Sequence, residues 1–321
     1  MKHGSDIYGY AKKLGCKPEE IIDFSSNINL HTKPLYPKVD VVRYYDFRYK
    51  KLKETIAKRY KLKPSRIALF NGASSAIFHL LQTLPNKIVT LYAPLYGEYE
   101  KAAEGKKILK INRFVNLYKK PPKNSIVIFV NPATPDGRYY DLEKLLKLWR
   151  ERNCTVILDE SFLEFEKLPS YRSEIENYKK LYIIQSFSKF YACAGVRIGA
   201  VFSSKENIQK LSLPMWALSS FDAEFLMQRL QDKSFRKTSR KKHKKRKKEL
   251  YRILAQHFEI FESNANFFLV KASKEVFEKL LKKKILVRKC GSFDYLDDGY
   301  LRFAVKDKKA HKKLKKALDV L

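Results

Sequence analysis

The sequence predicts an α/β protein that combines a large, mostly parallel sheet with a smaller α+β unit. Short apolar runs without polar alternation recur up to about residue 204, as expected of strands buried on both faces. Stretches with helical periodicity separate these runs, which favours a parallel sheet. After residue 204 helices and strands follow in a mixed order. With 321 residues, 45% of them hydrophobic, the chain is long and apolar enough to bury such a core.

The N-terminal arm, residues 1–40, is the first predicted unit. It holds a short helix at Ile7–Leu14 and a proline-bearing loop, and we expect it to join the small domain. The large domain is placed at residues 41–204. Its first helices are predicted around Leu52–Tyr60 and at Ser74–Leu84. Its predicted strands are Ile67–Phe70, Lys87–Leu91, Ser125–Val130, Thr155–Leu158, Leu181–Gln185 and Gly199–Phe202.

The small domain is predicted to span residues 205–321. It opens with one long helical region at 205–258. A strand at Asn266–Val270 and a helix at 274–283 follow, and further strands are expected near Ile285–Arg288 and Tyr300–Val305 before a closing helix.

The chain is strongly basic, with 67 Lys and Arg against 34 Asp and Glu and a formal net charge of +33. The densest run, Arg236–Lys248, holds ten Lys and Arg and no acidic residue. It is either a patch that binds nucleic acid or another polyanion, or the solvated face of a helix that continues into Leu250 and Leu254. We favour the solvated helix face and expect nucleic-acid binding to be non-specific at most.

The four cysteines are widely spaced and form no C-x-x-C pair. Neither a disulfide framework nor a metal site is therefore indicated. No apolar stretch approaches the ~18 residues of a membrane span. These features lead us to expect a cytoplasmic location.

Four loops that follow predicted strands carry residues suited to ligand binding. They are Asn71–Ser75, Asn131–Gly137, the acidic pair Asp159-Glu160, and Ser186–Lys189. In a parallel sheet the loops at the carboxyl ends of the strands meet at one edge, where ligands collect. Small residues that open a helix, as in Asn71–Ser75, leave N–H groups free to hold a phosphate.

Ser186–Gly199 contains the pattern S-x-S-K-x-x-x-x-A-G-x-R-x-G, which resembles the cofactor-lysine motif of the class I/II aminotransferase family. Asp159–Phe162 (D-E-S-F), Asn131–Gly137 (N-P-A-T-P-D-G) and Asn71–Ile77 (N-G-A-S-S-A-I) precede it in the family's order. The resemblance covers nearly the whole chain. It implies the pyridoxal-phosphate (PLP) fold type I, with a seven-stranded sheet in the large domain.

The resemblance implies catalytic roles for Lys189, Asp159 and Tyr96. Lys189 would form the Schiff base with the cofactor aldehyde, and Asp159 would keep the ring nitrogen protonated. Tyr96 would stack on the ring. The residues expected to contact the cofactor are Ala73, Ser74, Tyr96, Thr134, Asp159, Phe162, Ser186, Ser188, Lys189, Arg197 and, from a neighbouring subunit, Tyr44. A homodimer is expected on this basis.

Two positions depart from the family pattern, and both concern the ring oxygen of the cofactor. Phe162 stands where many members have Tyr, and Thr134 stands where they have Asn. Each loss of a hydrogen bond is expected to weaken ring anchoring by about 0.5–1.5 kcal/mol and to raise the pKa of the imine.

The two ends of the chain resemble the threonine-phosphate decarboxylases of cobalamin biosynthesis. The shared features are His3-Gly4, Asp23–Asn29 and Arg288–Phe293, together with Arg302. The resemblance implies that His3, Gly4, Asn27, Thr134, Arg288 and Arg302 bind the substrate's phosphate and carboxylate.

Two other functions stay open at this point. One is a histidinol-phosphate-type or other amino acid aminotransferase, since the sequence does not fix which bond at the substrate α-carbon breaks. The other is a non-catalytic, basic nucleic-acid-binding protein that retains the fold.

Overall fold

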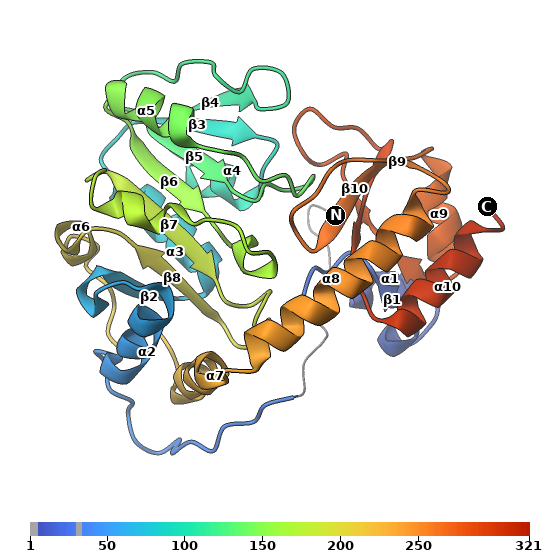
Figure 1. Ribbon diagram of the computed structural model, residues 1–321, viewed down its shortest axis with the longest axis horizontal. Helices are drawn as coiled ribbons and strands as arrows, with labels where there is room; N and C mark the ends of the chain where they lie inside the picture. Colours follow the sequence, from blue (N-terminus) through green and yellow to red (C-terminus); the bar gives the residue numbers. More distant parts are fainter. Residues whose placement is uncertain (1–5, 30–33) are drawn as a thin grey trace.

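The computed structural model describes residues 6–29 and 34–321, and within them a seven-stranded sheet forms the centre of the larger unit (Figure 1). Its strand order is β2-β8-β7-β6-β5-β3-β4. The bounds are β2 Ile67–Asn71, β3 Ile88–Ala93, β4 Lys107–Asn112, β5 Ile126–Val130, β6 Thr155–Asp159, β7 Leu181–Ser186 and β8 Ile198–Phe202. The predicted α/β class and mostly parallel sheet are confirmed.

Strand β8 runs antiparallel to both of its neighbours, β2 and β7, while the remaining strand pairs are parallel. Of the strands in this sheet, the sequence analysis missed one, β4. This edge strand is only partly buried and has lysines at both Lys107 and Lys110, so it lacks the continuous apolar run of a central strand.

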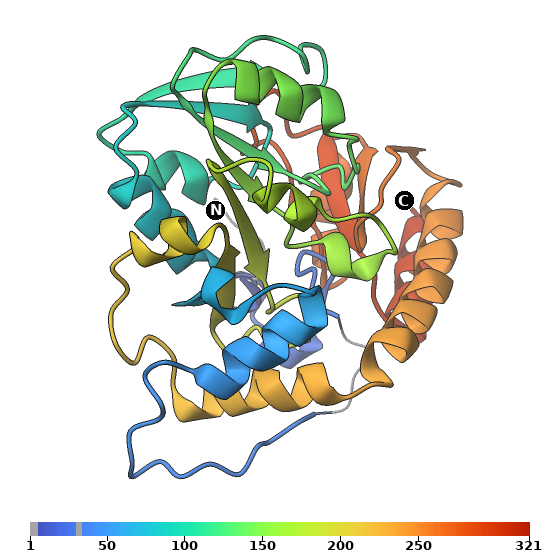
Figure 2. The same cartoon turned by 60° about the vertical axis from the view of Figure 1, so that its left-hand side comes forward.

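Helices cover both faces of this sheet, and the smaller unit lies beside its carboxyl edge (Figures 1 and 2). On one face, α2 (Lys50–Tyr60), α5 (Glu143–Glu151) and α7 (Ser220–Gln231) contribute to one hydrophobic cluster. On the other face, α3 (Gly72–Thr83) and α4 (Glu98–Ala102) contribute to a second cluster. Short 3₁₀ turns occur at Pro18–Glu20, Pro64–Arg66, Leu163–Phe165 and Tyr171–Ile175.

The single helical region expected over 205–258 is wrong in detail, because three helices occupy it. They are α6 (Lys205–Gln209), α7 and α8 (Phe235–Leu254). The loop between α6 and α7 contains Pro214, which lacks the N–H needed to continue a helix. Leu226 and Phe235 are buried in the large domain's cluster. The boundary at 204/205 stays a prediction, and this packing favours one near the start of α8.

The smaller unit is built around a four-stranded sheet of order β12-β13-β10-β9. Its elements are β9 Glu259–Ile260, β10 Phe267–Lys271, α9 Glu275–Lys282, β11 Ile285–Leu286, β12 Arg288–Lys289, β13 Tyr300–Ala304 and α10 Lys308–Leu318. The N-terminal arm contributes α1 (Ile7–Leu14) and β1 (Ile22–Asp23), and β1 pairs in parallel with β11. Phe24 is fully buried in this unit's core, so this part of the arm packs on the smaller unit.

The basic run lies on α8, which connects the two units (Figure 1). His243 and Leu250 of this helix are buried, whereas Lys241 and Lys244 are exposed. The run is therefore part of a helix with one solvated face, while the expectation that it binds nucleic acid non-specifically at most stays a prediction. Within the described ranges, none of the helices is both long and apolar enough to cross a membrane.

Candidate active site

A cavity of about 990 Å³ lies at the carboxyl edge of the large sheet, where the N-terminal arm and the small domain meet it. Most of the predicted site residues line it: Asn27, Ala73, Ser74, Tyr96, Thr134, Asp159, Phe162, Ser186, Ser188, Lys189, Arg197, Arg288 and Arg302. These positions are far apart in the sequence, and the tertiary structure brings them together. His3 and Gly4 lie outside the described residues.

Lys189 follows β7 and faces the cavity close to the ring of Phe162, whose centroid is 5.5 Å from the lysine Nζ. Burial lowers the pKa of Lys189. Asp159 opposes this shift, while the positive charges of Arg197 and Arg302 add to it. The lowered pKa makes the neutral amine, which is the nucleophilic form, more accessible than in a solvated lysine.

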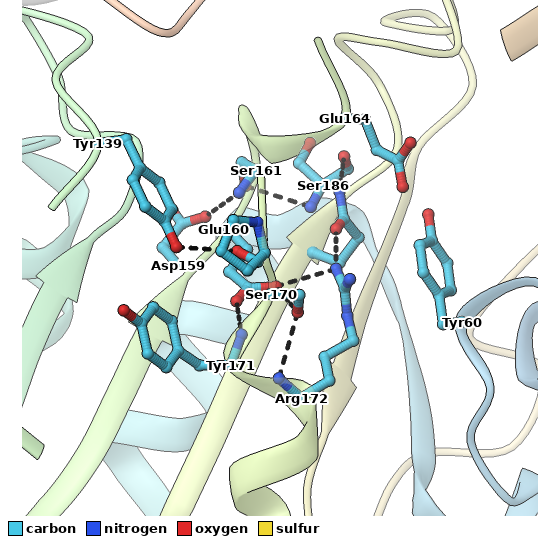
Figure 3. Close-up of polar contacts among 12 residues, drawn as sticks. Tyr60, Tyr139, Asp159, Glu160, Ser161, Glu164, Ser170, Tyr171, Arg172 and Ser186 are labelled. Atoms are coloured by element: carbon cyan, nitrogen blue, oxygen red, sulfur yellow. Dashed lines mark hydrogen bonds and ion pairs between the residues drawn. The ribbon is translucent and has the colours of Figure 1, made fainter. Parts of the chain in front are cut away.

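Asp159 is the last residue of β6, and its side chain is held by two donors. The hydroxyl of Tyr99 donates to Oδ2 at 2.9 Å, and the backbone N–H of Ser161 donates to Oδ1 at 2.8 Å. The hydroxyl of Ser161 in turn accepts from the backbone N–H of Ser186 at 3.2 Å, as Figure 3 shows. Asp159 is thus fixed at the end of β6 and linked to the end of β7.

The N-terminus of α3, Ser186, Ser188 and Arg197 together form a candidate anion site. The Ser186 and Ser188 hydroxyls are 2.8 Å apart. Gly72 has φ +79°, and a Cβ there would lie 2.7 Å from the Arg197 guanidinium. The guanidinium therefore reaches the first turn of α3, where unpaired N–H groups favour a phosphate.

Glycine is also required at Gly199 in β8. A Cβ at this position would lie 2.5 Å from the backbone nitrogen of Ala73. Its absence lets β8 pack directly against the start of α3, which brings Arg197 and Ala73 to the same side of the cavity.

A buried polar network lies next to the ends of β6 and β7 (Figure 3). Glu160 accepts from the Ser170 hydroxyl at 2.6 Å and from the backbone of Tyr171 at 2.8 Å. Arg172 lies 3.1 Å from Glu160 and also donates to Gln185 at 2.5 Å. These contacts join the residues next to Asp159 and Ser186, so the network holds the two strand ends in register.

The other half of the cavity carries two arginines on adjacent strands, Arg288 of β12 and Arg302 of β13, which are direct register partners. Arg302 donates to the Thr134 hydroxyl at 3.0 Å. Burial, with a smaller contribution from the charge of Arg288, lowers the pKa of Arg302 to about 10. Among the described residues no carboxylate forms an ion pair with Arg302, so an anionic ligand would be stabilised here.

The loop that carries Thr134 is braced by a residue that the sequence analysis missed, Arg113. Its guanidinium makes a bidentate pair with Asp136, at 2.5 and 2.9 Å, and donates to the carbonyl of Thr134 at 3.2 Å. Arg113 was not recognisable because the chain contains 67 basic residues and nothing in its local sequence sets it apart. Tyr99 and Ser161 were missed for a similar reason, since their partners are remote or backbone groups.

Tyr44 does not line the cavity. Its side chain is 84% exposed, and its ring centroid lies 4.7 Å from that of Trp216. Local packing on Trp216 accounts for its position within one chain. A contact with a neighbouring subunit stays a prediction.

The cavity fits the cofactor that the sequence resemblance implies. It places a lysine of lowered pKa, a carboxylate with fixed orientation and an anion site around one apolar space lined by Tyr96 and Phe162. PLP has an aldehyde, a ring nitrogen and a phosphate that match these three groups. Lys189, Asp159 and the Arg197 site would hold them respectively.

Comparisons with known proteins agree with this geometry. The family model for aminotransferase class I and II matches residues 20–321. The bifunctional adenosylcobalamin biosynthesis protein CobDQ of Leptospira interrogans is 31% identical over 98% of this chain, which spans 40% of that protein's length. Histidinol-phosphate aminotransferase of Flavobacterium psychrophilum is 28% identical, with 94% of this chain and 93% of that protein covered. Threonine-phosphate decarboxylase of Salmonella typhimurium is 24% identical, with 98% and 95% covered.

Solved structures show the same fold. Histidinol-phosphate aminotransferase from Clostridium acetobutylicum aligns with a TM-score of 0.82 at 30% identity, covering 92% of this chain and 98% of that one. L-Threonine-O-3-phosphate decarboxylase from Porphyromonas gingivalis aligns with a TM-score of 0.79 at 20% identity, covering 99% and 96%. Histidinol-phosphate aminotransferase from Sinorhizobium meliloti, solved with pyridoxal-5'-phosphate, aligns at 0.80 and 18% identity, covering 98% and 93%. The chain belongs to the class I and II aminotransferase family and is a PLP-dependent enzyme.

Proposed function

We propose that this enzyme is a lyase that decarboxylates a phosphorylated amino acid of the threonine-phosphate type. One observation carries the proposal: the cavity has two separate cationic regions. Arg197 and the start of α3 form the first, and Arg288 and Arg302 form the second. The cofactor's phosphate would occupy the first region. The second then remains for a substrate that itself bears both a phosphate and a carboxylate.

The side chains divide the work in the following way. When bound, PLP supplies an electron sink for the bond that breaks at the substrate α-carbon. Lys189 would hold the cofactor aldehyde through its amine and could deliver or remove a proton at the substrate α-carbon. Asp159 would keep the ring nitrogen protonated, and Tyr96 would lie against the ring. We propose these roles for the residues whose positions are described above.

Substrate orientation decides between loss of carbon dioxide and transfer of the amino group. The bond that breaks is the one held perpendicular to the cofactor ring, so the anchors for the carboxylate and the phosphate select the reaction. Arg302 is braced by Thr134, and Arg288 donates to Ser292 at 2.9 Å. These groups, together with Asn27 of the arm, are our candidates for the anchors.

A histidinol-phosphate-type aminotransferase is the second candidate, supported by the 30% identity to the Clostridium acetobutylicum structure. The paired arginines favour the decarboxylase, because histidinol phosphate has a phosphate but no carboxylate. The carboxylate of an amino-group acceptor could nevertheless occupy the same arginine.

Product analysis distinguishes the two candidates. Purified holoenzyme is incubated separately with threonine phosphate and with histidinol phosphate plus 2-oxoglutarate, while carbon dioxide and glutamate are measured. The proposal expects carbon dioxide from threonine phosphate and little glutamate in the second reaction. Glutamate formation without carbon dioxide would assign the aminotransferase instead.

We also propose that the enzyme acts as a homodimer. The segment 34–47 extends away from the body of the chain (Figures 1 and 2). It exposes Tyr36, Val41, Val42 and Tyr44 by 80% or more. Such a large apolar surface is typical of an interface between proteins. Tyr44 would reach the anion site of the neighbouring copy.

Light scattering and cofactor binding test the dimer together. We expect the mass of two chains, and Tyr44→Phe should weaken cofactor binding without changing that mass. A monomer that retains full cofactor affinity would refute both parts.

A further inference from the structure

We propose that Tyr99 is a positioning residue that holds the Asp159 carboxylate toward the ring nitrogen of the cofactor. This inference rests on the proposed role of Asp159. Tyr99 does not line the cavity, so it acts through Asp159 and not by touching the substrate or the cofactor.

The geometry leaves the carboxylate of Asp159 little freedom. Tyr99 is fully buried, and its hydroxyl donates to Oδ2 at 2.9 Å from one side. The backbone N–H of Ser161 donates to Oδ1 at 2.8 Å from the other side. The backbone carbonyl of Asp159 also accepts from Asn131 at 2.8 Å. Each carboxylate oxygen therefore has one fixed donor, and rotation about the side chain would break both bonds.

Tyr99 presents a neutral hydroxyl group to the Asp159 carboxylate. Burial, together with the nearby Asp159 charge, raises the pKa of Tyr99 well above its usual range. Tyr99 therefore stays a neutral hydrogen-bond donor at any working pH. A donor to a carboxylate stabilises its ionised form, and an ionised carboxylate beside a pyridine nitrogen stabilises the protonated ring.

Tyr99 also connects Asp159 with Tyr96, which lines the cavity. The two tyrosines lie three residues apart at the start of α4, and the backbone N–H of Tyr99 donates to the carbonyl of Tyr96 at 3.1 Å. One short turn therefore places an aromatic side chain at the cavity and a hydroxyl behind it on Asp159. A shift of this turn would displace both groups at once.

The chain offers a matched control in Tyr92, a fully buried tyrosine of strand β3. Its hydroxyl accepts from Trp149 at 2.9 Å and donates to the carbonyl of Lys119 at 3.3 Å, away from the cavity. Tyr99→Phe and Tyr92→Phe thus remove the same atom from equally buried positions. Only the first removes a contact with Asp159.

The test uses holoenzyme reconstituted with ¹⁵N-labelled PLP. We expect Tyr99→Phe to weaken cofactor binding roughly 10- to 150-fold, the range for a hydrogen bond to a charged group. The ring nitrogen should also lose its proton at a lower pH than in the wild type. This loss is measured as a change of the ring-nitrogen chemical shift toward that of the unprotonated ring. Tyr92→Phe should leave cofactor affinity within about 2-fold of wild type and should not alter the pH at which the ring-nitrogen shift changes.

A third variant separates failure of this inference from failure of the proposed function. Asp159→Asn keeps the shape but removes the charge, and Tyr99→Phe should add no further change to the ring-nitrogen shift in that background. If Tyr99→Phe behaves like Tyr92→Phe while Asp159→Asn alters the shift, the role of Tyr99 is overturned. If Asp159→Asn leaves the shift unchanged, the proposed role of Asp159 fails.

Discussion

The two halves of the cavity differ in how completely their polar groups are satisfied. In the cofactor half, Asp159 accepts two hydrogen bonds, and Ser186 and Ser188 contact each other. In the substrate half, Arg302 is buried, its Nε has no hydrogen-bond partner among the described residues, and its pKa is lowered. Lys306 beside the arm is also buried, with a pKa lowered to about 8.

This difference indicates two modes of binding. The large sheet fixes the cofactor half in advance, so that a permanent cofactor meets a rigid frame. In the substrate half, burial of the positive charge of Arg302 has a desolvation free energy that no ion pair among the described residues offsets, and binding of an anion would offset it. The predictions below test this contrast, from the largest expected effect to the smallest.

Removal of the lysine amine should have the largest effect. Lys189→Ala is expected to abolish the visible absorbance of the bound cofactor and to reduce activity by about 10²- to 10⁴-fold or more, as for loss of a proton-transfer group. Lys247→Met is the control, because Lys247 is also a lysine of lowered pKa but lies outside the cavity. Unchanged absorbance in Lys189→Ala would contradict the assignment.

Arg302→Ala should affect the substrate half alone. We expect kcat/KM for a carboxylate-bearing substrate to fall roughly 10- to 100-fold, because a charged hydrogen bond is lost, while cofactor affinity stays within about 2-fold. Arg302→Lys should recover only part of the loss, since lysine lacks the planar fork. A variant that loses cofactor and substrate equally would show that the halves are not independent.

Loss of a hydrogen bond that links the arm to the segment of Lys189 should have a smaller effect. Asn29 of the arm donates its side-chain amide to the carbonyl of Phe190 at 2.8 Å and its backbone N–H to that of Lys189 at 2.9 Å. Asn29→Ala removes one neutral hydrogen bond and should raise KM about 3- to 10-fold with an unchanged cofactor spectrum. Asn86→Ala removes a hydrogen bond from the Asn86 side-chain amide to the Asn124 carbonyl, outside the cavity. This variant serves as the comparison in steady-state kinetics. Equal KM values for the two variants would argue against the link.

The pH dependence of stability should show the smallest effect. Burial lowers the pKa of Lys306 from 10.5 to about 8, so between these values the unfolded chain binds more protons than the folded one. The free energy of unfolding should therefore rise with pH across this window, by at most about 1.4 kcal/mol per pH unit from this group. Denaturant unfolding should show this gain in wild type relative to Lys306→Met. Parallel curves would mean that Lys306 is not desolvated.

Much of the cofactor half could be predicted from the sequence, because its residues follow strands directly. Asp159 and Ser186 end β6 and β7, and a strand end fixes where the next side chain can point. The edge strand β4 and the break between α6 and α7 were not predictable in the same way. Their local sequences satisfy competing patterns, and only packing against neighbours decides between them.

The sequence by itself determined the fold class and the order of the motifs, and the resemblance of these motifs to a known family implied most of the residues that line the cavity. These depend on local periodicity and on residue types at strand ends, which a linear chain carries in full. The tertiary structure alone decided that Tyr99 contacts Asp159, that Arg113 braces the Thr134 loop and that Arg302 forms no ion pair with a carboxylate among the described residues. Such contacts join residues remote in the chain, and their energies depend on burial, which no local pattern specifies.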